Sequence, residues 1–273
     1  MSDLVTVEIH KHIADVRLNR PDKSNALSWP MFEAITETGR ALARDRDVRA
    51  VVLSGAGEHF CAGLDLENFA TIGPGEDIFG PGRGGFWPNF YQLPAQVWRE
   101  VPVPVICALQ GVAYGGGLQI ALGADIRIAR PDARLSVMEI KWGLVPDMSA
   151  TQTLRHLVRL DVAKELTFSG RVVDGSEAQA IGLVTQLADD PLAAARELAV
   201  DIASRNPDAI AMGKFLLDKT REGSHADGLR TEEQLQRRLL GSRNQMEAVA
   251  AGLERRPGDY QPRDFTGFDE LQD

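Results

Sequence analysis

The chain of 273 residues has only two cysteines, Cys61 and Cys107, and they lie far apart in the sequence. Their spacing matches no metal-binding or redox motif, and so few thiols suit a reducing compartment. The longest apolar run, around residues 103–109, is too short to span a bilayer. The N-terminal segment lacks the apolar core of a signal peptide. We therefore expect a cytoplasmic globular protein with no membrane partner.

Positive charge is also scarce, because the chain has 30 lysines and arginines against 39 aspartates and glutamates, which gives a net charge of -9. This balance offers no basic surface to a phosphate backbone and argues against nucleic acid as the main partner. The sequence contains no Walker loop, no H-E-x-x-H, no G-x-S-x-G and no dinucleotide fingerprint around its glycines. Metal, nucleotide-phosphate and serine-nucleophile chemistry therefore lack their usual residues.

What the chain does have is a regular succession of apolar segments. Strands are expected over residues 5–9, 13–18, 48–55, 103–111 and 124–129, and helices over 28–44, 116–122, 149–166 and 190–205, with a capping box at 176–179 that opens a short helix. The first two strands form an antiparallel pair. Because helices separate the later strands, crossover connections and largely parallel sheets are expected, which is an α/β fold.

Strand patterns end near Asn206 and Pro207, and the remaining residues have the pattern of helices with charged faces. We therefore divide the chain into a core, residues 1–206, and a helical C-terminal region, residues 207–273. Leucines of this region would have little core to cover in a monomer, which suggests oligomerisation; they are Leu216, Leu235, Leu239 and Leu240. Residues 73–91 are rich in glycine and aromatics, and are either a flexible surface loop or the wall of an apolar pocket.

Two glycine-rich segments follow apolar strands: "CAGLDL", residues 61–66, and "YGGGLQ", residues 114–119. Such turns at strand ends can direct two backbone N–H groups to one point, where they would stabilise negative charge on a carbonyl oxygen. A helix beginning near Gly116 would add its positive dipole end. The alternative is that the glycines only permit close packing of helix and strand.

Four segments together resemble the crotonase family, the enoyl-CoA hydratase/isomerase superfamily: "NRPDKSNALS", "FCAGLDL", "VPVPVICALQGVAYGGGLQIALGADIRIA" and "GLVTQLADD". The resemblance implies a spiral core of ββα units with a helical C-terminal trimerisation region. It also implies a homotrimer or a dimer of trimers that acts on acyl-CoA thioesters, with coenzyme A part of the substrate and no separate cofactor.

The same resemblance assigns individual residues. The two N–H groups of the family's oxyanion hole would be those of Leu64 and Gly116. The CoA path would be lined by Lys23, Ala26, Ala62, Asp65 and Leu66. The alternative for these five is ordinary turn and strand-end structure.

Three further positions bear on the reaction. Glu139 matches a catalytic glutamate of the family, and Asp147 matches an acid of its dienoyl-CoA isomerases or else caps the helix that follows. Gln119 stands where hydratases have their other glutamate; an amide orients water but cannot accept its proton. A single base suffices to move an allylic proton, so the sequence favours double-bond isomerisation in fatty acid metabolism. Hydration by an enoyl-CoA hydratase and non-catalytic acyl-CoA binding are the alternatives.

Overall fold

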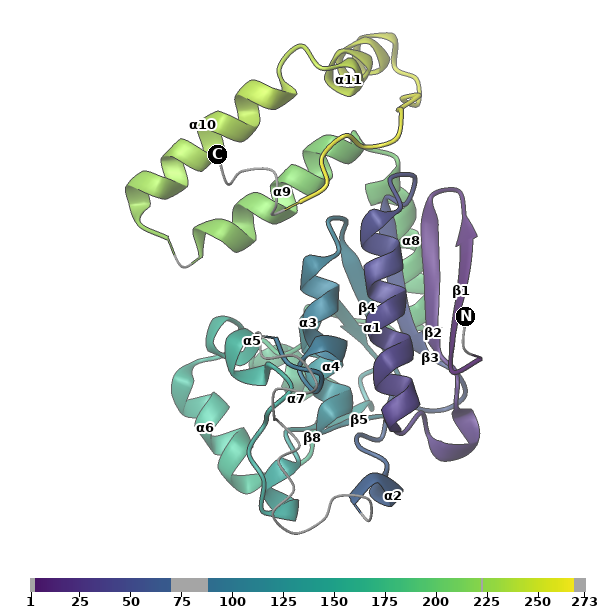
Figure 1. Cartoon of the computed structure of the whole chain (residues 1–273), viewed down its shortest axis with the longest axis vertical. Helices are drawn as coiled ribbons and strands as arrows, with labels where there is room; N and C mark the ends of the chain where they lie inside the picture. The colour runs from purple at the N-terminus through teal and green to yellow at the C-terminus, as the bar shows by residue number, and fades with distance from the viewer. Residues whose placement is uncertain (1–2, 70–87, 222, 268–273) are drawn as a thin grey trace.

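The computed structural model describes residues 3–69, 88–221 and 223–267 (Figure 1). The strands are β1 (Val5–His10), β2 (Ile13–Leu18), β3 (Ala50–Gly55), β4 (Val105–Leu109), β5 (Val112–Tyr114), β6 (Ile126–Ala129), β7 (Arg134–Ser136), β8 (Val173–Asp174) and β9 (Gln186–Leu187). The helices are α1 (Trp29–Arg44), α2 (Leu66–Phe69), α3 (Leu93–Glu100), α4 (Gly116–Gly123), α5 (Ala150–Leu157), α6 (Leu160–Ser169), α7 (Gly175–Ala180), α8 (Pro191–Ala203), α9 (Pro207–Thr220), α10 (His225–Leu239) and α11 (Arg243–Glu254).

The strands form two sheets. The larger has the order β1-β2-β3-β4-β6-β9; β1 is antiparallel to β2, and every later neighbour is parallel. The smaller has the order β5-β7-β8. The antiparallel first pair and the parallel crossovers confirm the α/β class that the strand and helix pattern predicts.

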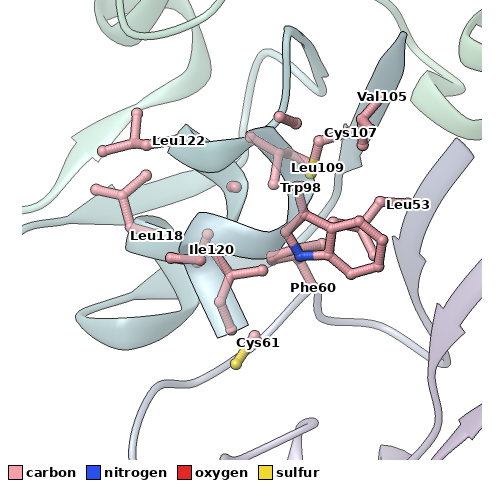
Figure 2. Packing of buried hydrophobic residues seen from close by; sticks show 14 of the residues in the cluster. Leu53, Phe60, Cys61, Trp98, Val105, Cys107, Leu109, Leu118, Ile120 and Leu122 are labelled. Atoms are coloured by element: carbon pink, nitrogen blue, oxygen red, sulfur yellow. The ribbon is translucent and has the colours of Figure 1, made fainter. Parts of the chain in front are cut away.

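Successive side chains of a buried strand point to opposite faces of the larger sheet, and both faces are covered by helices. Val51 and Leu53 of β3 belong to the main core, which also contains residues of α1, α3 and α4. Ala50 and Val52 of the same strand pack instead with alanines of α8. Figure 1 accordingly places α1 and α8 on opposite sides of the sheet. Figure 2 shows the main core around the fully buried ring of Trp98.

The C-terminal helices α9, α10 and α11 project from the end of the sheet (Figure 1). They enclose a small core of their own, made of Ala211, Met212, Phe215, Leu235 and Phe265. Of the four leucines expected to lack cover, Leu235 belongs to this core, Leu216 and Leu239 pack against it, and Leu240 is 61% exposed. Within the described part of this region, residues 207–221 and 223–267, no strand is present, as the pattern predicts.

Two expected helices differ from the pattern. Residues 149–166 form two helices rather than one, because Val158 is extended (φ -128°, ψ 162°) and separates α5 from α6. The short helix near 176–179 begins two residues earlier than the capping box suggests, with Asp174 as its N-cap, where the carboxylate accepts a hydrogen bond from the Glu177 N–H at 2.8 Å. No helix in the described ranges is long and apolar enough to cross a membrane.

Candidate active site

Three chain segments lie side by side beyond the strand ends and build the site. The Leu27 N–H donates to Gly63 O at 2.8 Å, and the Asp65 N–H donates back to Leu27 O at 3.1 Å. On the other side, the Cys61 N–H donates to Val112 O at 3.0 Å. These parallel bridges connect the first glycine-rich segment to both the loop before α1 and the strand that leads into α4.

The bridges leave two backbone N–H groups available. Within the described residues, neither the Leu64 N–H nor the Gly116 N–H donates to a backbone or side-chain acceptor. Gly116 is the first residue of α4, where N–H groups have no partner inside the helix. A Cβ atom on Gly63 would lie 3.9 Å from the Gly116 nitrogen, so the two segments approach closely here.

The three consecutive glycines serve different purposes. Gly115 has a φ of 49°, which a side chain rarely allows, and a Cβ there would lie 3.2 Å from Glu139 Oε1. A Cβ on Gly116 would lie 2.7 Å from Met148 Sδ, whereas one on Gly117 would lie 2.5 Å from Cys61 O. Gly117 therefore fits the packing explanation, and Gly115 fits the site explanation.

One pocket of about 770 Å³ collects nearly all the candidate residues. Those in its wall are Lys23, Ala26, Ala62, Leu64, Asp65, Leu66, Gly116, Glu139 and Asp147. Gln119 is the exception, because its side chain lies behind Glu139 and outside the pocket lining. The structure thus brings together nine residues from four separate stretches of the chain.

Glu139 is one of two buried acids in the lining of this pocket, with 8% of its surface exposed; the other is Asp65. It begins a short 3-10 helix, η3 (Glu139–Trp142). Burial raises the pKa of the Glu139 carboxyl and the nearby charge of Asp147 raises it further, while hydrogen bonds from its own backbone and from Gln119 lower it. Its Oε2 atom is buried and has no hydrogen-bond partner in the described residues. A raised pKa brings this carboxyl nearer the range useful for proton transfer at neutral pH.

Asp147 also lies in the pocket wall, and the residue is exposed. Desolvation by the surrounding protein raises the pKa of its carboxyl. The sequence leaves open that Asp147 caps the helix after it, but the N-cap of α5 is Ser149. The oxygen that accepts from the backbone at this helix start belongs to Gln119.

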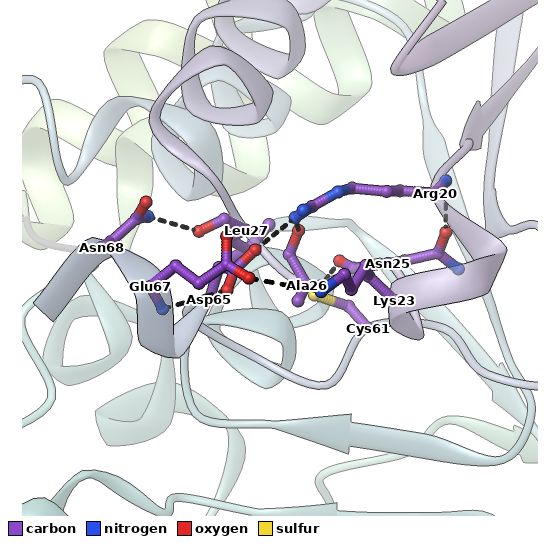
Figure 3. Close-up of polar contacts among 9 residues, drawn as sticks. All are labelled: Arg20, Lys23, Asn25, Ala26, Leu27, Cys61, Asp65, Glu67 and Asn68. Carbon is purple, nitrogen blue, oxygen red and sulfur yellow. Dashed lines mark hydrogen bonds and ion pairs between the residues drawn. The ribbon is translucent and has the colours of Figure 1, made fainter. Parts of the chain in front are cut away.

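The loop before α1 contains two residues that the assignments above leave out and whose side chains hold the loops of the site together (Figure 3). Arg20 Nη1 forms an ion pair with Asp65 Oδ2 at 2.6 Å, and this pair lowers the pKa of the Asp65 carboxyl. Asn25, fully buried with a φ of 55°, donates from its amide to Ala56 O and His59 O. Both lie inside "NRPDKSNALS", so a left-handed asparagine and a pairing arginine in that motif were the available signal.

Aromatic residues form part of the pocket wall. Trp29 and Phe32 of α1 line it together with Tyr91, and these rings pack edge to face. Phe90 stacks on Phe32 with ring centroids 5.7 Å apart. The end of segment 73–91 therefore does form a pocket wall. Phe79, Phe86 and Trp87 lie outside the described residues.

Comparison with known proteins agrees with this geometry. The sequence model of the enoyl-CoA hydratase/isomerase family matches residues 8–263. The mitochondrial methylglutaconyl-CoA hydratase of Mus musculus is 32% identical over 260 residues, covering 93% of this chain and 81% of that protein. The enoyl-CoA hydratase of Bacillus anthracis superposes with a TM-score of 0.87 at 29% identity, over 95% of this chain and 100% of that one. The enoyl-CoA hydratase of Mycobacterium tuberculosis H37Rv gives 0.84 at 28% identity, over 96% and 100%. The crotonase fold expected from the sequence is thereby confirmed.

Proposed function

The chain belongs to the enoyl-CoA hydratase/isomerase family and is an enzyme of that type, and we propose that it isomerises a double bond in an acyl-CoA thioester. The thioester oxygen would accept hydrogen bonds from the Leu64 and Gly116 N–H groups. As a proton leaves the carbon chain, negative charge develops on that oxygen, where preset donors stabilise it. The proton would pass to Glu139 and return to another carbon from Glu139 or Asp147, so that no atom is gained or lost.

The observation that carries this proposal is that two carboxyl groups of raised pKa lie in the same pocket wall as two N–H groups that have no acceptor among the described residues. Hydration is the second candidate, since two carboxyl groups can also hold a water molecule between them. The name of the methylglutaconyl-CoA hydratase relative favours it as well. The side chain of Gln119, which is 1% exposed and hydrogen-bonded to Glu139, is outside the lining of the pocket in which such a water would bind.

A panel of thioesters tests the proposal. We expect 3-enoyl-CoA and 3,5-dienoyl-CoA esters to be isomerised faster than 2-enoyl-CoA esters are hydrated. Isomerisation is followed by the absorbance of the conjugated product, and hydration by the loss of the enoyl thioester absorbance. Faster hydration would replace the first candidate with the second. Binding of every ester without turnover, measured by calorimetry, would instead support an acyl-CoA binding protein.

For the coenzyme we propose the path through Lys23, Ala26, Ala62, Asp65 and Leu66. The Lys23 ammonium group lies 3.3 Å from the Glu67 carboxylate, and both side chains are largely exposed, so the pair is weak and can open to a phosphate. The ion pair between Arg20 and Asp65 connects the segment that contains Lys23 to the segment that contains Leu66. Coenzyme A enters as part of the substrate, and the proposed reaction needs no further cofactor. Both cysteines are free and buried, which suits the cytoplasm that we propose as its location.

We also propose that the protein is a trimer or a dimer of trimers. Met246, Val249 and Leu253 of α11 are exposed and recur at the spacing of one helix face. Light scattering of the full chain should give three or six times its mass of 29.8 kDa. Replacing Val249 and Leu253 by aspartate should lower that mass. A monomer at micromolar concentration would contradict the assembly, and an unchanged mass in the variant would exclude this helix face.

A further inference from the structure

The side chain of Gln119 is engaged at both ends. Its Nε2 donates to Glu139 Oε1 at 2.6 Å, and its Oε1 accepts from the Met148 N–H at 2.8 Å and from the Ala150 N–H at 3.2 Å. The residue is buried in α4, two residues after the glycine triplet. A water molecule in the pocket could bind this amide only if one of these hydrogen bonds broke. The role of orienting water, expected from the sequence, does not fit these contacts.

The two N–H groups that meet at the Gln119 oxygen flank Ser149. Ser149 has a φ of 65°, a left-handed conformation that is uncommon for a residue with a side chain and that persists where surrounding contacts enforce it. Its own hydroxyl is buried without a partner in the described residues and therefore does not hold the turn. Asp147 lies two residues before Ser149. The Gln119 oxygen consequently holds the turn that follows Asp147.

At the other end, Gln119 distinguishes the two oxygens of Glu139. Oε1 accepts the Gln119 hydrogen bond and lies close to Gly115, where a Cβ would be 3.2 Å away. Oε2 is buried and has no donor in the described residues. Since an oxygen that already accepts a short hydrogen bond is a poorer site for a proton, the proton that Glu139 takes up belongs on Oε2.

We infer that Gln119 is a positioning residue of the reaction, whose amide nitrogen orients Glu139 while its oxygen holds the turn that carries Asp147. The inference rests on the proposed function, because it gives Glu139 the role of the base. Gln119 would thus act through two acids, Glu139 and Asp147, and not through a direct contact with water. Among the described residues, Asp147 is the charged group that raises the pKa of Glu139 through its electric field.

Three variants separate positioning from simple structural support. Gln119→Met removes both the donor and the acceptor at nearly constant size. Gln119→Glu keeps an oxygen for the Met148 and Ala150 N–H groups but presents a carboxylate to Glu139. Thr153→Val is the matched control, because the buried Thr153 hydroxyl donates to Ala150 O at 3.0 Å in the first turn of α5 and does not contact Glu139.

The expected results follow from the hydrogen bonds. Gln119→Met should lower kcat about tenfold or more with little change in KM, because the base is displaced while the substrate contacts remain. The acidic limb of its pH–rate profile should move to higher pH, since the lost hydrogen bond favoured the ionised Glu139. Gln119→Glu should move the limb in the same direction, because two adjacent carboxylates must share a proton. Thr153→Val should leave the limb in place.

A titration that needs no turnover keeps the inference separate from the proposed function. In protein labelled with ¹³C at the glutamate carboxyl, the Glu139 signal is the one missing from Glu139→Gln, and its midpoint should rise in Gln119→Met. If no thioester turns over but the midpoint rises, the positioning role stands and the proposed function falls. If turnover is found and neither the limb nor the midpoint moves, the positioning role is overturned. Faster hydration by Gln119→Glu with an unmoved limb would overturn it too.

Discussion

Glu139→Gln is expected to lower kcat by about a hundredfold or more, the usual cost of removing an acid–base catalyst. Binding of the thioester should be nearly unchanged, since the Leu64 and Gly116 N–H groups and the CoA path are unaffected. Stopped-flow turnover and calorimetric binding of the same ester measure the two effects. The control is Glu100→Gln on α3, another carboxyl whose pKa is raised by burial but which is not in the pocket lining.

The same substitution should not destabilise the fold at neutral pH. A carboxyl whose pKa is higher in the folded than in the unfolded state disfavours folding above that pKa, and protonation removes the penalty as the pH falls. Glutamine carries no charge to desolvate, so the Tm at pH 7 should equal or exceed that of the wild type. Nearly full activity of the variant would show that Glu139 is not the base. Weak ester binding at an unchanged Tm would show that Glu139 also holds the ground-state ester, against the expectation.

The sequence pattern predicts the buried strands well because each is a short apolar run that ends in a turn signal. Strand β3, for instance, is apolar on both faces, as a parallel strand covered by α1 and α8 must be. The break at Val158 could not be foreseen in this way. Leu157 and Val158 continue the apolar stripe into α6, and neither glycine nor proline marks the change.

The site also has features that the sequence predicts and features that it does not. The backbone N–H donors can be predicted from the sequence, because glycines beside strand ends, such as Gly63 and Gly115, are typical of positive φ values. The hydrogen bond between Gln119 and Glu139 cannot be predicted from the sequence, because Glu139 lies twenty residues later on a separate short helix. Whether a residue one turn into α4 faces the pocket or a neighbour depends on how η3 packs against α4. Local pattern contains no information on that contact.

The two acids should have separable effects on pH dependence. Asp147→Asn is expected to lower kcat about tenfold to a hundredfold if Asp147 returns the proton to the distant carbon. It should also move the acidic limb to lower pH, because the negative charge of Asp147 raises the pKa of Glu139 and the amide does not. This direction is opposite to the one expected for Gln119→Met. Steady-state rates on a 3,5-dienoyl-CoA ester across pH measure both quantities.

The control for Asp147→Asn is Asp161→Asn, an exposed acid on α6 outside the pocket lining. A lower kcat with an unmoved limb would show that Asp147 acts without an electrostatic effect on Glu139. An unchanged kcat on every ester would remove Asp147 from the reaction and leave Glu139 as a single shuttling base. The double variant Glu139→Gln/Asp147→Asn should be little slower than Glu139→Gln alone, because two groups that pass one proton act as a unit and their losses do not add.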